Sequence, residues 1–184
     1  MLLNFIAIMG IAAVIVIWII STRRRLAVLD DNASNAICQI GVQLSGQLDA
    51  LLTLVDFTRS YAEDESETLM AVIKSRRRVI TAKSTPDDVL REEGLISETL
   101  GMIALLTEQY PELKTNQTYI KTMDAVQIFE NMMHTSRLIY NDSVTKLNRE
   151  IRMFPVFLIA ALLGFNQRDY LEEQGARADT SHTK

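Results

Sequence analysis

Cysteine and histidine are scarce in this chain of 184 residues, which contains one cysteine, Cys38, and two histidines, His134 and His182. A single cysteine excludes an intramolecular disulfide bond and a cysteine-based zinc cluster. Two histidines are too few for a histidine-rich metal site. Cys38 lies close to Ile40 in an apolar helical pattern, so we expect a small core residue, because a reactive thiol needs a nearby base.

Glycine and proline are also few, at 7 and 3 residues, while 48% of the chain is hydrophobic. This composition favours long helices over a β fold rich in turns. The net charge of −4, from 19 basic and 23 acidic residues, lacks the basic excess of a nucleic-acid-binding protein. The arginines at 76–78 are interpreted as a solvated helix face, with an anion-binding site as the alternative.

Charged side chains are absent from residues 2–20, where Asn4 is the one clearly polar residue. A helix of this length reaches roughly 29 Å, close to the thickness of the hydrocarbon core of a bilayer. Trp18 lies near one end, where interfacial aromatic residues are common. We therefore predict a transmembrane anchor at residues 1–21. The alternative, a cleaved signal peptide, would have a basic segment before the apolar run and small residues at its cleavage site.

Three arginines, Arg23, Arg24 and Arg25, follow the apolar run, and no charged side chain precedes it. The one apolar run predicts a single-pass protein of the bacterial cell membrane, and the positive-inside rule predicts its orientation. Its N-terminus would lie outside and the remainder of the chain in the cytoplasm.

Beyond the arginines, apolar residues recur every three or four positions, which is the helical period. The first stripe consists of Ile37, Ile40, Leu44, Leu48, Leu51 and Val55. This helix is expected to continue from the membrane to about Tyr61. Gly41 and Gly46 either weaken it or permit close packing.

Three further helices are predicted at about 69–80, from the helix start at 84–88 to Tyr110, and from about Thr115 to Arg152. Short connections favour antiparallel neighbours. The predicted fold is therefore all-α, with a transmembrane helix that continues into an antiparallel up-and-down four-helix bundle. The bundle would comprise residues 22–171, followed by a disordered polar tail at residues 172–184.

An apolar segment at residues 156–163 follows the fourth helix and is too short to span a bilayer. In an up-and-down arrangement the fourth helix returns toward the membrane. Phe157, Leu158, Leu162 and Phe165 are therefore candidates for contact with the membrane or with a partner protein. The alternative is that this segment packs beneath the base of the bundle.

A polar stripe is predicted on the fourth helix, because residues separated by seven, four and seven positions share one face. Its members are Glu130, Arg137, Asn141 and Asn148. The favoured interpretation is a buried hydrogen-bonded network that fixes the helix register, and the alternative is a polar site or gate. Charged groups at such a boundary need partners, and Asp49 and Glu108 are the candidates.

Glu130 and His134 have the spacing of half a carboxylate–histidine metal site, but a competent site needs further ligands. We therefore expect no metal and no cofactor. No convergent nucleophile and base can be identified either. The sequence thus predicts a protein that is not an enzyme and has no catalytic residues.

Several motifs together carry a family resemblance. They are Tyr110-Pro111-Glu112-Leu113-Lys114, then Arg137, Tyr140-Asn141, Asn148 and Phe154-Pro155 in that order, and Gly164-Phe165. With them, the chain resembles the LemA family of bacterial membrane proteins from about residue 35 to 172, together with the anchor. The sequence departs from the family pattern around Ser45-Gly46-Gln47, where a basic pair is usual.

The resemblance implies a helical domain on an N-terminal anchor, with the polar stripe as a family feature and no established enzymatic activity. Some members are linked to surface display, and one relative is linked to building an organelle membrane. We therefore expect a protein of the bacterial inner membrane that acts as a non-catalytic scaffold or interaction protein, with a role in membrane organisation or remodelling. Its expected partners are the lipid bilayer and either further copies of itself or other membrane proteins, without nucleic acid or a small-molecule substrate. The alternative is a sensor or regulator in which partner binding rearranges the bundle.

Overall fold

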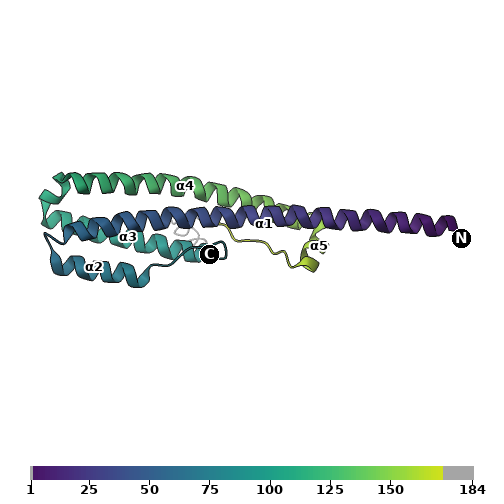
Figure 1. The fold of residues 1–184 in the computed structure, drawn as a ribbon, viewed down its shortest axis with the longest axis horizontal. Coiled ribbons are helices and arrows are strands. Elements are labelled where there is room, and N and C mark those ends of the chain that lie inside the picture. Colours follow the sequence, from purple (N-terminus) through teal and green to yellow (C-terminus); the bar gives the residue numbers. More distant parts are fainter. Residues whose placement is uncertain (1, 172–184) are drawn as a thin grey trace, which may run out of the picture. The chain divides into compact units, whose positions relative to one another are not determined.

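The computed structural model describes residues 2–171 and contains, within them, five α-helices, one 3-10 helix and no strand (Figure 1). The predicted all-α fold class is confirmed. The elements are α1 (Leu2–Thr58), α2 (Glu63–Arg76), α3 (Pro86–Gln109), η1 (Pro111–Thr115), α4 (Gln117–Arg152) and α5 (Val156–Leu163). The tail predicted at residues 172–184 lies outside the described residues.

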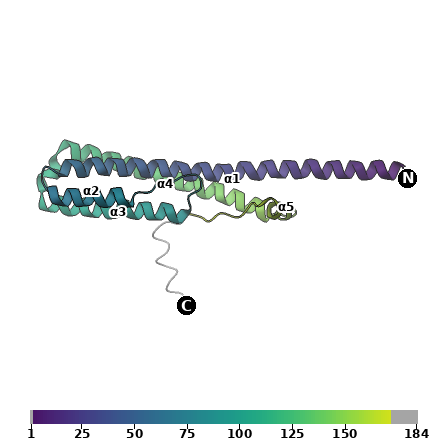
Figure 2. The same cartoon turned by 60° about the horizontal axis from the view of Figure 1, so that its bottom comes forward.

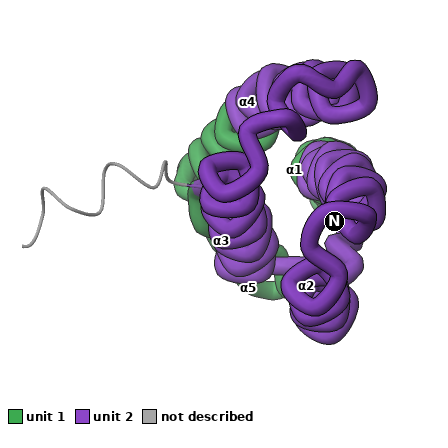
Figure 3. Tube along the Cα trace, turned by 90° about the vertical axis from the view of Figure 1, so that its left-hand side faces the viewer, with its two compact units in different colours: residues 1–34, 140–170 green, residues 35–139, 171–184 purple. Residues whose placement is uncertain are grey.

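The chain divides into two compact units, which Figure 3 distinguishes by colour. Among the described residues, unit 1 comprises 2–34 and 140–170, and unit 2 comprises 35–139 and 171. α1 and α4 therefore each contribute a segment to both units. α5 belongs to unit 1, and α2, α3 and η1 belong to unit 2.

The part of α1 in unit 1 begins with side chains that are exposed on every side, from Asn4 to Ser21. These exposed side chains include Phe5, Ile11, Val14 and Trp18. α1 is the one helix among the described residues that is long and apolar enough to cross a membrane, as judged by length and composition.

The core of unit 1 begins directly after the arginines that follow the apolar run. Its buried residues are Leu26 of α1, Leu147 and Ile151 of α4, and Val156 and Ala160 of α5, with Leu29 and Phe165 packed against them. α5 ends at Gly164, whose φ of 79° is left-handed and suits a residue without a Cβ atom.

Within unit 2, polar contacts join the helices in chain order and then return to the first. The hydroxyl groups of Thr58 and Ser66 lie 2.9 Å apart between α1 and α2. Arg76 of α2 contacts Glu98 of α3 at 2.6 Å, and both views show these two helices side by side (Figures 1 and 2). The two further contacts, from α3 to α4 and from α4 to α1, belong to the candidate site below.

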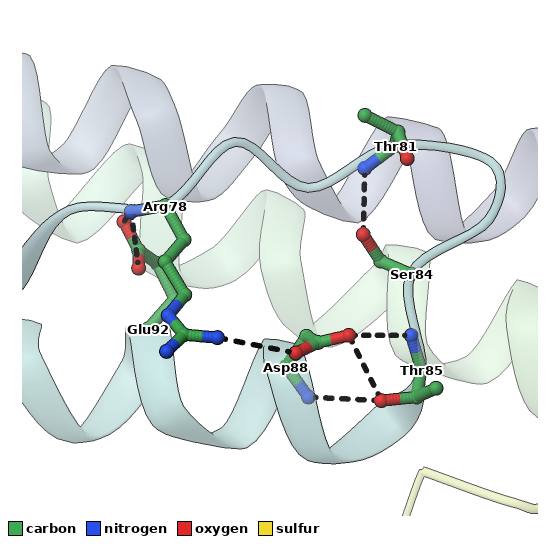
Figure 4. Close-up of polar contacts among 6 residues, drawn as sticks. All are labelled: Arg78, Thr81, Ser84, Thr85, Asp88 and Glu92. Carbon is green, nitrogen blue, oxygen red and sulfur yellow. Dashed lines mark hydrogen bonds and ion pairs between the residues drawn. The ribbon is translucent and has the colours of Figure 1, made fainter.

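The start of α3 follows the sequence prediction closely (Figure 4). Thr85 is the N-cap, and its hydroxyl accepts the backbone N–H of Asp88, whose carboxylate accepts the N–H of Thr85 in return. Pro86 occupies the first turn, where its missing N–H has no helical partner to lose. The hydrogen bonds that the Asp88 carboxylate accepts from the backbone N–H and the hydroxyl of Thr85 hold the pKa of Asp88 below its usual range.

The connection between α2 and α3 differs from the prediction, because α2 ends at Arg76 and Ile80 lies outside any helix. Glu92, which is buried on α3, accepts the backbone N–H of Arg78 at 3.0 Å (Figure 4). Ile80 is also buried and lies against Gly41 of α1. Ile80, which the sequence predicts in the second helix, therefore packs against α1 from the connection between α2 and α3.

The prediction that Cys38 is a core residue is wrong, because Cys38 is exposed. Ile37 and Ile40 are buried on α1. Position 38 is about half a turn from position 40 on a helix with 3.6 residues per turn. Cys38 therefore faces away from the side that Ile40 buries.

Replacement of Gly41 by alanine is expected to destabilise the protein. A Cβ atom at Gly41 would lie 2.7 Å from both the Cβ and the carbonyl oxygen of Ile80, and the backbone oxygen cannot move cheaply. We expect Gly41→Ala to lower the free energy of unfolding by about 1–3 kcal/mol, measured by urea unfolding in detergent with far-ultraviolet circular dichroism.

Gly101→Ala is the matched control, since no heavy atom lies within 4 Å of its added Cβ. That change should raise the free energy of unfolding by up to about 1 kcal/mol, because alanine is the better helix former. Equal stabilisation by both substitutions would contradict the close packing at Gly41.

Candidate functional site

A cavity of about 400 Å³ in unit 2 lies among α1, α3 and α4. Its lining combines charged and apolar side chains: Gln47, Glu93, Ile96, Ser97, Leu100, Glu130, Met133, His134 and Arg137. Two members of the predicted polar stripe, Glu130 and Arg137, are thus brought to one cavity. We call these lining residues the polar groove.

Arg137 of α4 and Glu93 of α3 form the principal ion pair of the groove. Nε of Arg137 donates to Oε1 of Glu93 at 3.0 Å, and Nη2 donates to Oε2. The two side chains are only 15% and 12% exposed. This two-pronged geometry is the strongest form of arginine–carboxylate contact.

The carboxylate partner of Arg137 differs from the candidates predicted from the sequence. Asp49 pairs instead with Nη1 of Arg77 at 2.6 Å, and Glu108 is exposed. The sequence did not indicate Glu93 as the partner, because Glu93 belongs to no periodic row of polar residues along α3. Only the packing of α3 against α4 shows that it faces the stripe.

Burial raises the pKa of Glu93, and the hydrogen bond and charge of Arg137 oppose that effect. The carboxylate of Glu130 raises the pKa of Glu93 further. Ionised Glu93 therefore depends on Arg137 to offset the cost of leaving water.

Gln47 of α1 supplies the partner of Glu130, donating from Nε2 to Oε2 at 3.1 Å. Gln47 is buried and lies in the segment where the sequence departs from the family pattern. The neighbouring Gly46 admits the ring of Phe129, since a Cβ atom there would lie 2.4 Å from it. Gln47 and Gly46 therefore set the contacts of α1 with α4 in this part of the groove.

Glu130 and His134, the pair with the spacing of half a metal site, both line the groove. Within residues 2–171, no group of three or more histidine, cysteine, aspartate or glutamate side chains is placed to hold a metal ion. What the groove presents is hydrogen-bonding and charged groups beside the apolar side chains of Ile96, Leu100 and Met133.

The other two stripe residues, Asn141 and Asn148, lie in unit 1. Asn148 is buried; its Nδ2 donates to the carbonyl oxygen of Arg168 at 2.8 Å and its Oδ1 accepts the N–H of Arg168 at 2.9 Å. Arg168 in turn contacts Asp30 at 2.8 Å and Ser34 at 2.7 Å. Asn148 therefore holds the segment after α5 against α4 within unit 1. The remaining stripe residue, Asn141, is half-buried.

The segment after α5 is also held by Tyr140, whose hydroxyl donates to the carbonyl oxygen of Asp169 at 2.9 Å. Burial raises the pKa of Tyr140. Sequence reasoning missed Arg168 and Asp169, because they lie outside the helices and no periodicity marks them.

The arginines at 76–78 each pair with a carboxylate. Their partners are Glu98, Asp49 and Asp88, at 2.6, 2.6 and 3.7 Å. Because α2 ends at Arg76, the predicted helix face is wrong for Arg77 and Arg78, which lie in the connection to α3. The paired carboxylates, all in unit 2, favour a structural role for the three arginines over anion binding.

The predicted contact segment lies in unit 1 and is exposed at Phe157, Leu158 and Leu162. The exposed fraction of Leu162 is 86%, and that of the preceding Phe154 is 81%. Phe165 differs, because it is half-buried and packs against the core of unit 1.

Comparison with known proteins gives a match between residues 36–183 and the model of the LemA family. The chain belongs to the LemA family. This member is also similar to two proteins of Paramagnetospirillum magneticum named magnetosome protein MamQ 1 and MamQ 2, at 30% identity over 88 residues. Magnetosome protein MamQ of Magnetospirillum gryphiswaldense is 27% identical over the same length. The matched segment covers 48% of this chain and 32% of the length of each relative.

Removal of Arg137 is expected to destabilise unit 2, because Glu93 would remain buried without a counter-charge. We expect Arg137→Met to lower the free energy of unfolding by about 2–4 kcal/mol, measured by urea unfolding in detergent. The double variant Glu93→Met/Arg137→Met should recover most of that loss.

Lys146→Met is the matched control, since Lys146 forms an exposed pair with Asp142 at 2.6 Å. Its loss should cost less than about 1 kcal/mol. If the double variant were as unstable as Arg137→Met, the unpaired charge of Glu93 would not be the cause.

Proposed function

We propose that this LemA-family protein is a membrane-anchored, non-catalytic scaffold that associates with itself and takes part in membrane organisation or remodelling. The observation that carries the proposal is the exposure of every side chain from Asn4 to Ser21 in an almost wholly apolar stretch of α1. Full burial of one large apolar side chain is worth about 1.5–3 kcal/mol. A bilayer supplies the apolar surroundings that the described residues do not.

The proposed anchor is a single pass with the N-terminus outside. Arg23, Arg24 and Arg25 follow the run and are exposed, which supports this orientation by the positive-inside rule. We further propose that the segments of α1, α2, α3 and α4 in unit 2 form an antiparallel up-and-down four-helix bundle. The chain of polar contacts from α1 to α4 and back supports that arrangement.

The proposed surface for self-association is an apolar stripe on α4 in unit 2. Ile128, Met132 and Ile139 share one face by helical spacing, and Leu138 lies beside them. All four are exposed. Apolar side chains grouped on a surface mark sites of protein contact, and a second copy of the chain presents a matching stripe.

Similarity to relatives named magnetosome proteins supports the membrane-organising part of the proposal. A second candidate function, a sensor or regulator, is favoured by the polar groove. There a partly buried ion pair lies beside a cavity of about 400 Å³, and a bound partner that competed for Arg137 would alter the packing of α3 against α4.

The anchor predicts that the full-length protein stays in the membrane pellet after a carbonate wash. Ile11→Arg/Ile15→Arg should move it to the supernatant, because each arginine at the centre of a span costs about 2.5–3.5 kcal/mol. Val42→Arg/Val79→Arg, at two exposed positions of unit 2, is the control and should stay in the pellet.

Wild-type protein in the carbonate supernatant would rule out the anchor. Orientation is read separately from Cys38, which is exposed and is the single cysteine. A membrane-impermeant maleimide should leave Cys38 unlabelled in intact cells and label it after lysis.

Self-association predicts an oligomer of the detergent-solubilised protein in sedimentation velocity. Ile128→Lys/Met132→Lys should shift it to the monomer, because the charges oppose burial of the α4 stripe. Thr118→Lys/Gln127→Lys places two charges at exposed polar positions of α4 and should leave the oligomer unchanged. A wild-type monomer, or equal loss in both variants, would argue against the α4 stripe as the interface.

A further inference from the structure

Helix α5 is held next to the arginines that end the apolar run of α1. Val156 and Ala160 share one buried cluster with Leu26, and Leu26 immediately follows Arg23–Arg25. The packing of unit 1 therefore fixes α5 at the depth of residues 23–26, just beyond the candidate span.

The side of α5 opposite this contact is apolar and exposed. Positions 158 and 162 lie roughly half a turn from positions 156 and 160 on a helix, and Leu158 and Leu162 are exposed, as is Phe157. The sequence of α5 contains no polar side chain. An exposed face of this kind, in a helix too short to span, suits the boundary between lipid headgroups and acyl chains.

Arginines from α1 and α4 occupy the same level of unit 1. Arg25 contacts Glu150 at 3.1 Å, which aligns the last turn of α4 with the end of the apolar run. Arg149 and Arg152 lie in that last turn and are exposed, as are Arg23 and Arg24. Glu150 itself is buried and paired with Arg25, so the exposed groups at 149–152 are basic.

We propose that α5 lies in the interfacial layer of the bilayer and that the surrounding arginines bind the phosphate groups of anionic lipids. The inference rests on the proposed anchor and adds a second point of membrane contact with a lipid preference. Guanidinium groups bind phosphate oxygens through paired hydrogen bonds, and basic residues next to a span attract anionic lipid. The apolar face of α5 and the surrounding arginines would thus contact the bilayer at the same depth.

Fluorescence quenching by brominated lipid tests the proposal in full-length protein reconstituted into vesicles. Trp18 is the single tryptophan, so wild-type protein reports on the anchor. In a Trp18→Phe background, Phe157→Trp and Leu162→Trp place the reporter on α5. Val79→Trp places it at an exposed position of unit 2, outside the α4 stripe, as the control.

We expect brominated lipid to quench the wild-type signal and both α5 reporters, and acrylamide alone to quench the Val79→Trp reporter. Quenching of wild type without quenching of either α5 reporter would overturn the interfacial placement while leaving the anchor intact. Loss of quenching in wild type as well would overturn the anchor and this inference together. Unchanged circular dichroism checks that each variant is folded.

Lipid preference is measured in vesicles with a constant ratio of phosphatidylcholine to phosphatidylglycerol. In one preparation the phosphatidylcholine carries the bromine, and in the other the phosphatidylglycerol does. Brominated phosphatidylglycerol should quench the Phe157→Trp reporter more than brominated phosphatidylcholine at the same mole fraction. Arg149→Gln/Arg152→Gln should remove that preference, whereas Arg91→Gln/Lys121→Gln, an equal charge change at exposed sites of unit 2, should retain it. Equal quenching by both lipids in the Phe157→Trp protein would overturn the role of the arginines.

Discussion

Burial of the apolar side chains of α1 is the constraint on which the rest of the structure depends. In unit 2 the helix carries its apolar residues on one stripe, and Leu44, Leu48 and Leu51 are fully or almost fully buried there. In unit 1 the residues from Asn4 to Ser21 are exposed on every side. A stripe can be covered by neighbouring helices, but an apolar surface all around a helix needs an apolar phase around it.

Polar groups beside these apolar surfaces are paired throughout the described part of the chain. No buried side-chain nitrogen or oxygen among residues 2–171 lacks a hydrogen-bond partner. Arg137 has Glu93, the buried Gln47 has Glu130, and Asn148 has the backbone of Arg168. Because an unpaired buried group costs more than a pair contributes, such contacts select one helix register over its neighbours.

The exposed apolar surfaces that remain are where the protein can meet other molecules. One is α5 in unit 1, and another is the α4 stripe of Ile128, Met132, Leu138 and Ile139 in unit 2. In the proposed function, both surfaces belong to a membrane-anchored protein of the LemA family. The polar groove is the third feature, and it differs from the other two because its charges are already paired.

Local sequence determined most of the helix boundaries. Pro86 starts α3, Pro111 follows Tyr110 at the end of α3, and Pro155 follows α4, since proline acts on the backbone next to it. The family, the all-α class and the apolar run of α1 are likewise readable from residue order. Tertiary structure alone decided that Glu93 pairs with Arg137 and that Ile80 lies outside the helix, against Gly41. Those outcomes depend on which element lies opposite, and the helical period shows which residues share a face but not what covers it.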